Sequence, residues 1–389
     1  MGDEHATGKE VSIRIPMSLK QRIFKNRFHI LLIIIWVCFQ VFLYVNSHLI
    51  TNREAEKYIN GANEIIYYGR FPFHYISYGT YVVFLAILFK LGLNYSGVYL
   101  VQLALNLIAT IAFFRNVKTI TGNIRTAYTA VLMFILFYHL QHWNTHLFTE
   151  SFMVSMLMIF WYGFLHFNLK KASGIIGLGV LLILLLFSRP TAILFLPAMV
   201  VYWIIKNSII WKDGIKIKWI VLAVSLLSIL FYIFIQFEKQ VLFSDLFISL
   251  QKGQVICGTA YYQEHFVSIE HHNAFWQNLL IFCKISGKKM LCFYGFIRPF
   301  YSTSHNIMLM VYYPVYPLAI IGIINNKIKR EHQYMMITFI LLINALLLIT
   351  CDSWEGRFIV PALPFIIVFA AIGFQKIVAH FIVRYHKQH

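Results

Sequence analysis

The sequence predicts an all-helical polytopic membrane protein with about ten transmembrane helices. Hydrophobic residues fill 59% of its 389 positions and charged residues only 12%, whereas soluble domains carry about 25% charged residues. The apolar runs are continuous, and several reach the roughly 20 residues that a helix needs to cross a bilayer. A β-barrel would instead show alternating segments of about ten residues. We therefore expect one transmembrane domain over residues 1–389, without a separate soluble domain.

The distribution of basic residues predicts the topology. Residues 1–27 end in four closely spaced Lys and Arg residues, which mark a cytoplasmic N-terminus. The apolar run that follows is long enough to stay as an anchor, so we expect no cleavable signal. Whether the next apolar run, 76–93, crosses the membrane decides on which side every later loop lies. If it lies in the interface or re-enters, the later basic loops are cytoplasmic, as the positive-inside rule requires.

The spans predicted in this way are 28–49, 97–114, 126–142, 148–168, 174–188, 190–205, 217–237, 304–324, 333–351 and 358–379. Residues 50–96 then form the first external loop, with juxtamembrane helices, and residues 238–303 form a long external loop. The chain must turn tightly at 188–190. The alternative is one kinked helix over 174–205, which would invert every later loop.

Composition excludes two other classes of site. The net charge of +18 does not indicate nucleic-acid binding, because the Lys and Arg residues are dispersed in short loops between helices. The residues His139, His142, His146 and Glu150 have a helical spacing that zinc could use. They match no known ligand signature, however, and the five cysteines lack CxxC spacing. We therefore predict neither a metal nor nucleic acid as a partner.

The segment after the first span predicts a helix on the outer membrane surface. Apolar residues recur at helical spacing in this segment: Tyr58, Ala62, Ile65 and Ile66. The segment also holds three of only 15 acidic residues, Glu54, Glu56 and Glu64, which indicates a functional site. Glu54 completes a capping box that begins at Thr51 and would start the helix. Capping and catalysis both remain open for Glu54, because a helix N-terminus favours a carboxylate.

Three further charges stand at the predicted outer ends of spans. Glu150 opens the apolar run 151–167, where an acidic residue is costly and marks a functional site. Arg189 lies within apolar sequence, so it either snorkels to the interface or binds a phosphate or carboxylate. Arg357 follows Glu355 at the start of the last span. This pair either binds substrate or forms a local ion pair on the surface.

The long external loop adds a last group of candidates. Lys288 and Lys289 lie in an aromatic-rich stretch on the predicted outer side, against the positive-inside trend. They either bind an anionic headgroup or a phosphate-linked substrate, or they belong to a solvated helix face. Arg298 and His305 are further candidates of the same kind.

Four short segments share patterns with a known superfamily. The segment from Glu54 to Gly69 reads E-x-x-x-Y-x-x-x-A-x-x-I-x-x-x-G. The other segments are Thr149-Glu150-Ser-Phe, Arg189-Pro-Thr-Ala and Glu355-Gly-Arg357-Phe. Together they resemble the GT-C superfamily of integral-membrane glycosyltransferases, in which the first pattern commonly begins with Asp. Because Glu replaces that Asp here, Glu54 and Glu56 both remain candidates for the base. The last segment also departs from the superfamily, with an inserted Gly and with Phe in place of Tyr.

The resemblance implies a GT-C-like fold and an inverting transfer of a sugar from a polyprenyl-phosphate donor. The acceptor would be a hydroxyl of a glycan, lipid or protein at the non-cytoplasmic face of the bilayer. Glu54 would be the catalytic base, Glu150 would orient hydroxyls, and Arg189 and Arg357 would bind the lipid phosphate. The other substrate-binding candidates are Tyr58, Lys288, Lys289, Arg298 and His305. No cofactor is implied. The membrane would be a bacterial plasma membrane, with the site facing the periplasm, or that of the endoplasmic reticulum.

Other activities predict different features. A transporter or flippase of lipid-linked saccharides predicts charges inside spans and broken helices in matched halves, which the sequence does not show. A second alternative is another enzyme that acts on lipid-linked intermediates, such as a polymerase of lipid-linked saccharides. A membrane acyltransferase would need a catalytic His deep within a span, whereas His166 and His380 lie towards predicted cytoplasmic ends.

Overall fold

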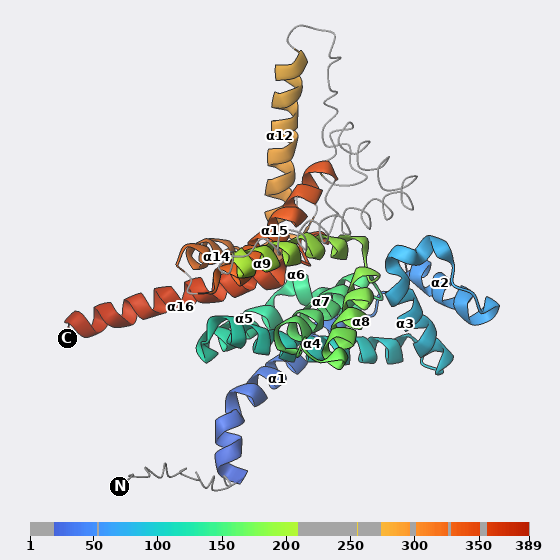
Figure 1. The fold of residues 1–389 in the computed structure, drawn as a ribbon, viewed down its shortest axis with the longest axis horizontal. Helices are drawn as coiled ribbons and strands as arrows, with labels where there is room; N and C mark the ends of the chain where they lie inside the picture. Colours follow the sequence, from blue (N-terminus) through green and yellow to red (C-terminus); the bar gives the residue numbers. More distant parts are fainter. Residues whose placement is uncertain are drawn as a thin grey trace, which may run out of the picture.

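The computed structural model describes residues 19–52, 54–208, 255, 274–295, 301–325, 328–350 and 356–388. Within these ranges the protein is all-helical (Figure 1). A single β-bridge in the described part joins Ile50 to His146. The first elements are α1 (Leu19–Ser47), α2 (Glu54–Tyr68), η1 (Phe73–Tyr78), α3 (Gly79–Lys90), α4 (Tyr95–Thr121), α5 (Ile124–Leu136), α6 (Tyr138–Gln141) and η2 (His142–Thr145). They are followed by α7 (Thr149–His166), α8 (Ala172–Leu186), η3 (Pro190–Leu194), α9 (Phe195–Ser208), α12 (Ala274–Tyr294), α13 (Thr303–Met310), α14 (Val315–Ile324), α15 (Arg330–Ile349) and α16 (Leu363–Gln388).

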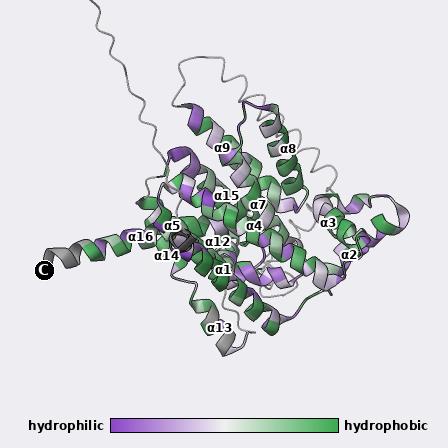
Figure 2. Cartoon of the chain, turned by 90° about the horizontal axis from the view of Figure 1, so that it is seen from below, coloured by the Kyte–Doolittle hydropathy of each residue, from purple (hydrophilic) through white to green (hydrophobic). Residues whose placement is uncertain are grey.

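Six segments in the described part of the chain are long and apolar enough to cross a membrane. They are Arg27–Ser47, Phe73–Lys90, Tyr95–Thr121, Pro190–Asn207, Arg330–Leu348 and Leu363–Ile382. Three shorter apolar helices are α5, α8 and α14, and the hydropathy colouring shows α8 as mainly hydrophobic (Figure 2). The all-helical membrane class is confirmed, whereas the count of about ten spans is not. The predicted span 217–237 lies outside the described residues.

Local sequence explains where helices α4 and α5 begin and end. The Asn94 side chain accepts a hydrogen bond from Gly97 N (2.9 Å) and caps the start of α4. Gly122 ends α4 with a φ of 65°, a left-handed conformation that suits glycine. Asn123 caps α5 by accepting a hydrogen bond from Arg125 N (2.9 Å). These signals reverse the chain sharply between the two helices.

Helices α1 and α4 run antiparallel. The His29 and Phe114 rings lie 5.0 Å apart near one end of the pair, and the Tyr44 and Tyr99 rings lie 5.3 Å apart near the other. Between these ring contacts, α1 donates a side-chain hydrogen bond to α4. The end of α1 therefore lies beside the start of α4. The intervening segment, with α2, η1 and α3, leaves and re-enters the bundle at the same end.

Helices α8 and α9 run in opposite directions on either side of a turn. The Phe195 ring of α9 lies 5.9 Å from Phe160 of α7, and the Tyr202 ring lies 4.8 Å from Phe164, so α9 runs parallel to α7. Helix α8 runs antiparallel to α7, because Gly177, near its start, faces Phe167 at the end of α7. The chain therefore turns at residues 188–190, as predicted, and the alternative of one kinked helix over 174–205 is wrong.

Helices α14 and α16 cross at two glycines. A Cβ atom at Gly322 would meet the carbonyl oxygen of Phe369, and one at Gly373 would meet the carbonyl oxygen of Leu318. Small residues allow helices in a membrane to approach closely, and packing then stabilises the pair. This crossing holds α16, whose preceding segment carries Arg357.

We expect Gly322→Ala to lower the thermal stability of the protein in detergent. The added methyl group meets backbone of α16, which cannot move aside as a side chain can, and overpacking typically costs about 1–3 kcal/mol. The control is Gly179→Ala on α8, where nothing lies within 4 Å of the added Cβ. Equal melting temperatures for the two variants would contradict the close crossing.

Candidate active site

Four separate segments meet at one end of the bundle. Glu54 begins α2, Glu150 lies in the first turn of α7, Arg189 precedes η3, and Arg357 precedes α16. The bridge between Ile50 and His146 ties the first two segments together, since Ile50 N donates to Thr145 O (2.9 Å) and Leu147 N donates to Ile50 O (3.1 Å). Residues predicted separately from the sequence are thus brought into one cluster.

The four side chains form a continuous chain of ion pairs. The Nη1 atom of Arg357 pairs with Oε2 of Glu54, and its Nε donates to Oε1 of Glu150. The same Oε1 atom lies 2.5 Å from Nη1 of Arg189. Arg357 therefore links the two carboxylates, and Glu150 links the two guanidinium groups. Such pairing is what allows charges to stay in a poorly solvated site.

Aromatic side chains cover the arginines. The Cζ atom of Arg357 lies 5.4 Å from the Trp143 ring centroid and 5.1 Å from that of Phe148. The Cζ atom of Arg189 lies 5.9 Å from the Phe358 ring centroid. Burial lowers the pKa of Arg357 to about 10, so this residue remains charged at neutral pH. Poor solvation strengthens the attraction of both arginines for an anion.

Buried amide side chains hold the aromatic cover in place. They are Gln40, Gln102, Gln141 and Asn144. The Asn144 Nδ2 atom donates to Oε1 of Gln40 (3.1 Å) and of Gln141 (2.9 Å). Gln102 Nε2 donates to His146 O (3.0 Å). These bonds fasten residues 141–148 to α1 and α4, and thereby fix Trp143 and Phe148 against Arg357.

The side chains of Glu54 and Glu56 lie in different surroundings. The Glu54 carboxylate faces the cluster, whereas Glu56 is exposed. The Oε1 atom of Glu54 also lies 2.7 Å from Lys57 Nζ and accepts a hydrogen bond from the Tyr58 hydroxyl (3.2 Å). A capping box that begins at Thr51 would place Glu54 at the third position of the helix. Helix α2 instead begins at Glu54, so this residue is the first of the helix.

The two carboxylates of the cluster differ in their access to solvent. The Glu54 side chain is 29% exposed, whereas the Glu150 side chain is 0% exposed. The second oxygen of Glu150, Oε2, is buried and has no hydrogen-bond partner among the described residues. Glu54 is therefore the more accessible of the two carboxylates, while Glu150 is enclosed between the arginines.

Tyr58 contributes a hydroxyl group to the cluster. It is fully buried and stacks edge-on against Tyr81, with ring centroids 5.5 Å apart. Burial raises the pKa of Tyr58 well above its usual range, so the hydroxyl stays protonated and donates to Glu54. Lys57 is not among the residues predicted from the sequence, although its i, i+3 spacing from Glu54 is a signal for an ion pair.

Among the remaining predicted residues, Lys289 has a described partner in another part of the structure. Lys289 on α12 donates to Leu348 O (3.2 Å) near the end of α15, and burial lowers its pKa to about 8. Lys288 is its neighbour on α12. Arg298 lies outside the described residues, and His305 lies in α13, where its side chain is not described. The described residues include no group of three or more His, Cys, Asp or Glu side chains that could hold a metal ion.

The sequence model of the Alg9-like mannosyltransferase family matches residues 13–388, nearly the whole chain. The chain belongs to the Alg9-like mannosyltransferase family. This family is part of the GT-C superfamily, so the resemblance predicted from the short segments is confirmed and the protein is a glycosyltransferase of the GT-C type. No curated protein and no solved structure matches the chain. Membership in this enzyme family gives no support to the transporter and polymerase alternatives.

We expect Arg189→Met to destabilise this member of the Alg9-like mannosyltransferase family strongly. The substitution leaves the buried Glu150 carboxylate with one cationic partner fewer, and breaking a buried ion pair costs about 3–5 kcal/mol. Thermal unfolding in detergent measures the change. Removing both charges in Glu150→Gln/Arg189→Met should recover part of the loss.

The matched control is Arg125→Met at the start of α5, where the arginine is exposed. Exposed substitutions usually stay within about 0.5 kcal/mol of the wild type. If Arg189→Met melted like Arg125→Met, the buried ion pair would not contribute to stability as described.

Proposed function

We propose that the enzyme transfers a sugar from a polyprenyl-phosphate donor to an acceptor hydroxyl at the non-cytoplasmic face, with inversion at the anomeric carbon. Mannose is the first sugar to test, because the family is named for mannosyl transfer. The observation that carries the proposal is the cluster itself. A partly exposed carboxylate, Glu54, lies directly beside the aromatic-covered Arg357, and Glu150 links Arg357 to a second covered arginine, Arg189.

The bundle geometry supports an external active site. The basic N-terminal residues favour a cytoplasmic start for α1, and the cluster lies at the opposite end of that helix, next to Ile50. Since α4 starts at the end where α1 stops, the segment 76–93 need not cross the membrane. This arrangement is compatible with about ten spans and a cytoplasmic C-terminus.

Glu54 is the proposed catalytic base. Its ion pairs with Arg357 and Lys57 leave the carboxylate charged, and a charged carboxylate can accept the proton of an acceptor hydroxyl. As the proton leaves, the hydroxyl oxygen attacks the anomeric carbon from the side opposite the phosphate, and the bond between carbon and phosphate oxygen breaks. This in-line displacement inverts the anomeric configuration.

The arginines are proposed to stabilise the leaving lipid phosphate. The phosphate gains negative charge as the glycosidic bond breaks, and preorganised cations in a poorly solvated site stabilise such charge well. Arg357 is the better placed of the two, since its side chain is 16% exposed and that of Arg189 8%. Glu150 is enclosed and would fix both guanidinium groups for this role.

We expect Glu54→Gln to lower the rate of sugar transfer by about 100-fold or more, because general base catalysis contributes roughly 10²–10⁴-fold. The amide keeps the size of the side chain but cannot take up the proton. Transfer is measured with purified protein in proteoliposomes, with a labelled mannosyl-phosphate polyprenol and a panel of glycan, lipid and protein acceptors.

Glu56→Gln is the matched control, since it removes the same charge two residues further along α2, on the exposed side of the helix. Its rate should stay close to that of the wild type. A wild-type rate in Glu54→Gln, or an equal loss in both variants, would exclude Glu54 as the base.

A further inference from the structure

Helix α4 has an exposed stripe of side chains that the proposed reaction does not use. Its members recur every three or four residues and therefore share one face of the helix: Leu100, Ala104, Ile108, Ile111, Arg115 and Lys118. The first four are apolar, and the last two are cationic. An amphiphile with an apolar chain and an anionic head would match this order of residues.

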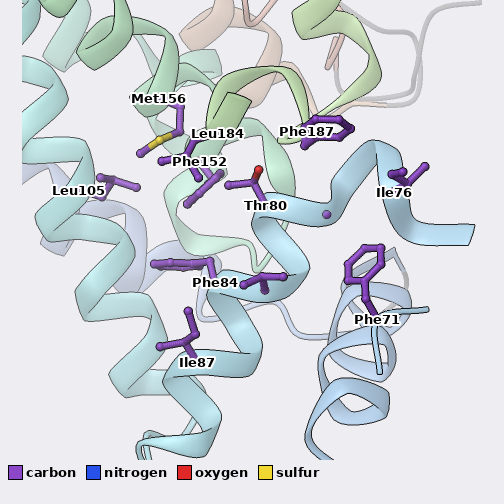
Figure 3. A pocket seen from close by; sticks show the side chains of 12 residues that line it. Phe71, Ile76, Thr80, Phe84, Ile87, Leu105, Phe152, Met156, Leu184 and Phe187 are labelled. Carbon is purple, nitrogen blue, oxygen red and sulfur yellow. The ribbon is translucent and has the colours of Figure 1, made fainter. Parts of the chain in front are cut away.

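A different face of α4 borders an apolar pocket of about 600 Å³ (Figure 3). Leu105 lines this pocket together with Phe84 of α3, Phe152 of α7 and Leu184 of α8. The pocket therefore lies towards the end of α7 that carries Glu150. No residue of the exposed stripe lines it, so the stripe is a separate surface.

The length of α4 places both cations near the edge of the hydrocarbon core. The apolar segment Tyr95–Thr121 has 27 residues, or about 40 Å at 1.5 Å per residue, whereas the core is about 30 Å thick. Arg115 and Lys118 belong to the last two turns of this helix. This end lies beside the start of α1, where the His29 and Phe114 rings are 5.0 Å apart. The positive-inside rule favours the cytoplasmic side for both helix ends.

Contacts with α7 hold the Arg115 side chain in place. Its Nη1 donates to the Tyr162 hydroxyl (3.1 Å), and its Cζ lies 5.7 Å from the centroid of the Tyr162 ring. The His166 ring stacks on Tyr162 with centroids 4.3 Å apart, and its Nε2 lies 3.0 Å from Thr119 Oγ1. The guanidinium group is therefore preorganised where α4 meets α7, which lowers the entropy cost of binding a ligand there.

No carboxylate balances these cations in the described structure. Glu150 is the only acidic residue between positions 65 and 212 of the sequence, and it lies at the other end of α7. The ion pairs among the described residues include neither Arg115 nor Lys118. Such a site favours a head with net negative charge over a zwitterion, and a guanidinium group binds phosphate oxygens especially well.

We propose that the junction of α4 and α7 binds an anionic phospholipid of the cytoplasmic leaflet. The lipid phosphate lies at Arg115, with Lys118 one turn further towards the solvent. One acyl chain lies along Ile108 and Ile111, which are 54% and 46% exposed. This lipid site does not depend on the proposed transfer reaction.

The bound lipid stabilises a helix pair that also supports the charged cluster. Asn116 Nδ2 donates to Met158 O (3.1 Å), which joins α4 to α7 beside the lipid site. Further along the same pair, Gln102 of α4 holds residues 144–146 and α7 begins with Glu150 in its first turn. Because the lipid needs both helices in place, it binds the folded protein and raises its melting temperature.

Lipid binding to purified, delipidated protein in detergent tests the proposal. The probes are radiolabelled phosphatidylglycerol and phosphatidylcholine with the same acyl chains. The wild type should bind phosphatidylglycerol at least about fivefold more tightly, and Arg115→Gln should remove most of this preference. The matched control is Arg125→Gln, which removes an exposed arginine at the start of α5, at the same end of the bundle, and should keep the preference.

Equal affinities for the two lipids in the wild type would overturn the proposal. A wild-type preference in Arg115→Gln, or an equal loss in Arg115→Gln and Arg125→Gln, would overturn it as well, since only the general charge of this end would then attract lipid. If Arg115→Gln fails to fold, Lys118→Gln, at an exposed position of the same site, decides in the same way.

Two further measurements separate a lipid site from a site for soluble phosphate. Phosphatidylglycerol should raise the melting temperature of the wild type more than that of Arg115→Gln. The soluble compound sn-glycerol 3-phosphate has a phosphate head without acyl chains, so it should not displace the lipid at equal concentration. Displacement by this compound, or equal melting shifts in both proteins, would contradict a phospholipid at this junction.

Discussion

The pairing of Arg357 with Glu54 and Glu150 is the constraint on which the rest of the site depends. A charge removed from water is costly unless an opposite charge meets it, and here each member of the cluster meets at least one. The partners come from segments up to 303 residues apart in the sequence. The starts of α2, α7 and α16 and the turn between α8 and α9 must therefore all reach one place before the charges are satisfied.

Packing around the cluster holds the segments that carry these charges in one place. The buried amides hold residues 141–148, and Trp143 and Phe148 in turn exclude water from Arg357. The glycine crossing of α14 and α16 fixes the helix that follows Arg357. Because these contacts involve different helix pairs, the site is held from several sides and its charges are preorganised, as electrostatic stabilisation of a transition state requires.

Glu54 and Glu150 differ in solvent exposure, and we therefore propose different roles for them. Glu54 can meet a substrate hydroxyl, while Glu150 is enclosed and shared by two arginines. The apolar pocket at Phe152 and Phe187 begins within two residues of that enclosed carboxylate and of Arg189.

The sequence by itself determined the class of the protein and most of its charged residues, because long apolar runs and scarce carboxylates are visible without a structure. It also determined the superfamily, through the segments around Glu54, Glu150, Arg189 and Arg357. Tertiary structure alone showed that Glu54 faces the cluster and Glu56 faces away from it, since nearby helix positions face different directions and only packing shows which direction is inward. It likewise placed Lys289 against the end of α15 and formed the apolar pocket, both of which depend on contacts between distant segments.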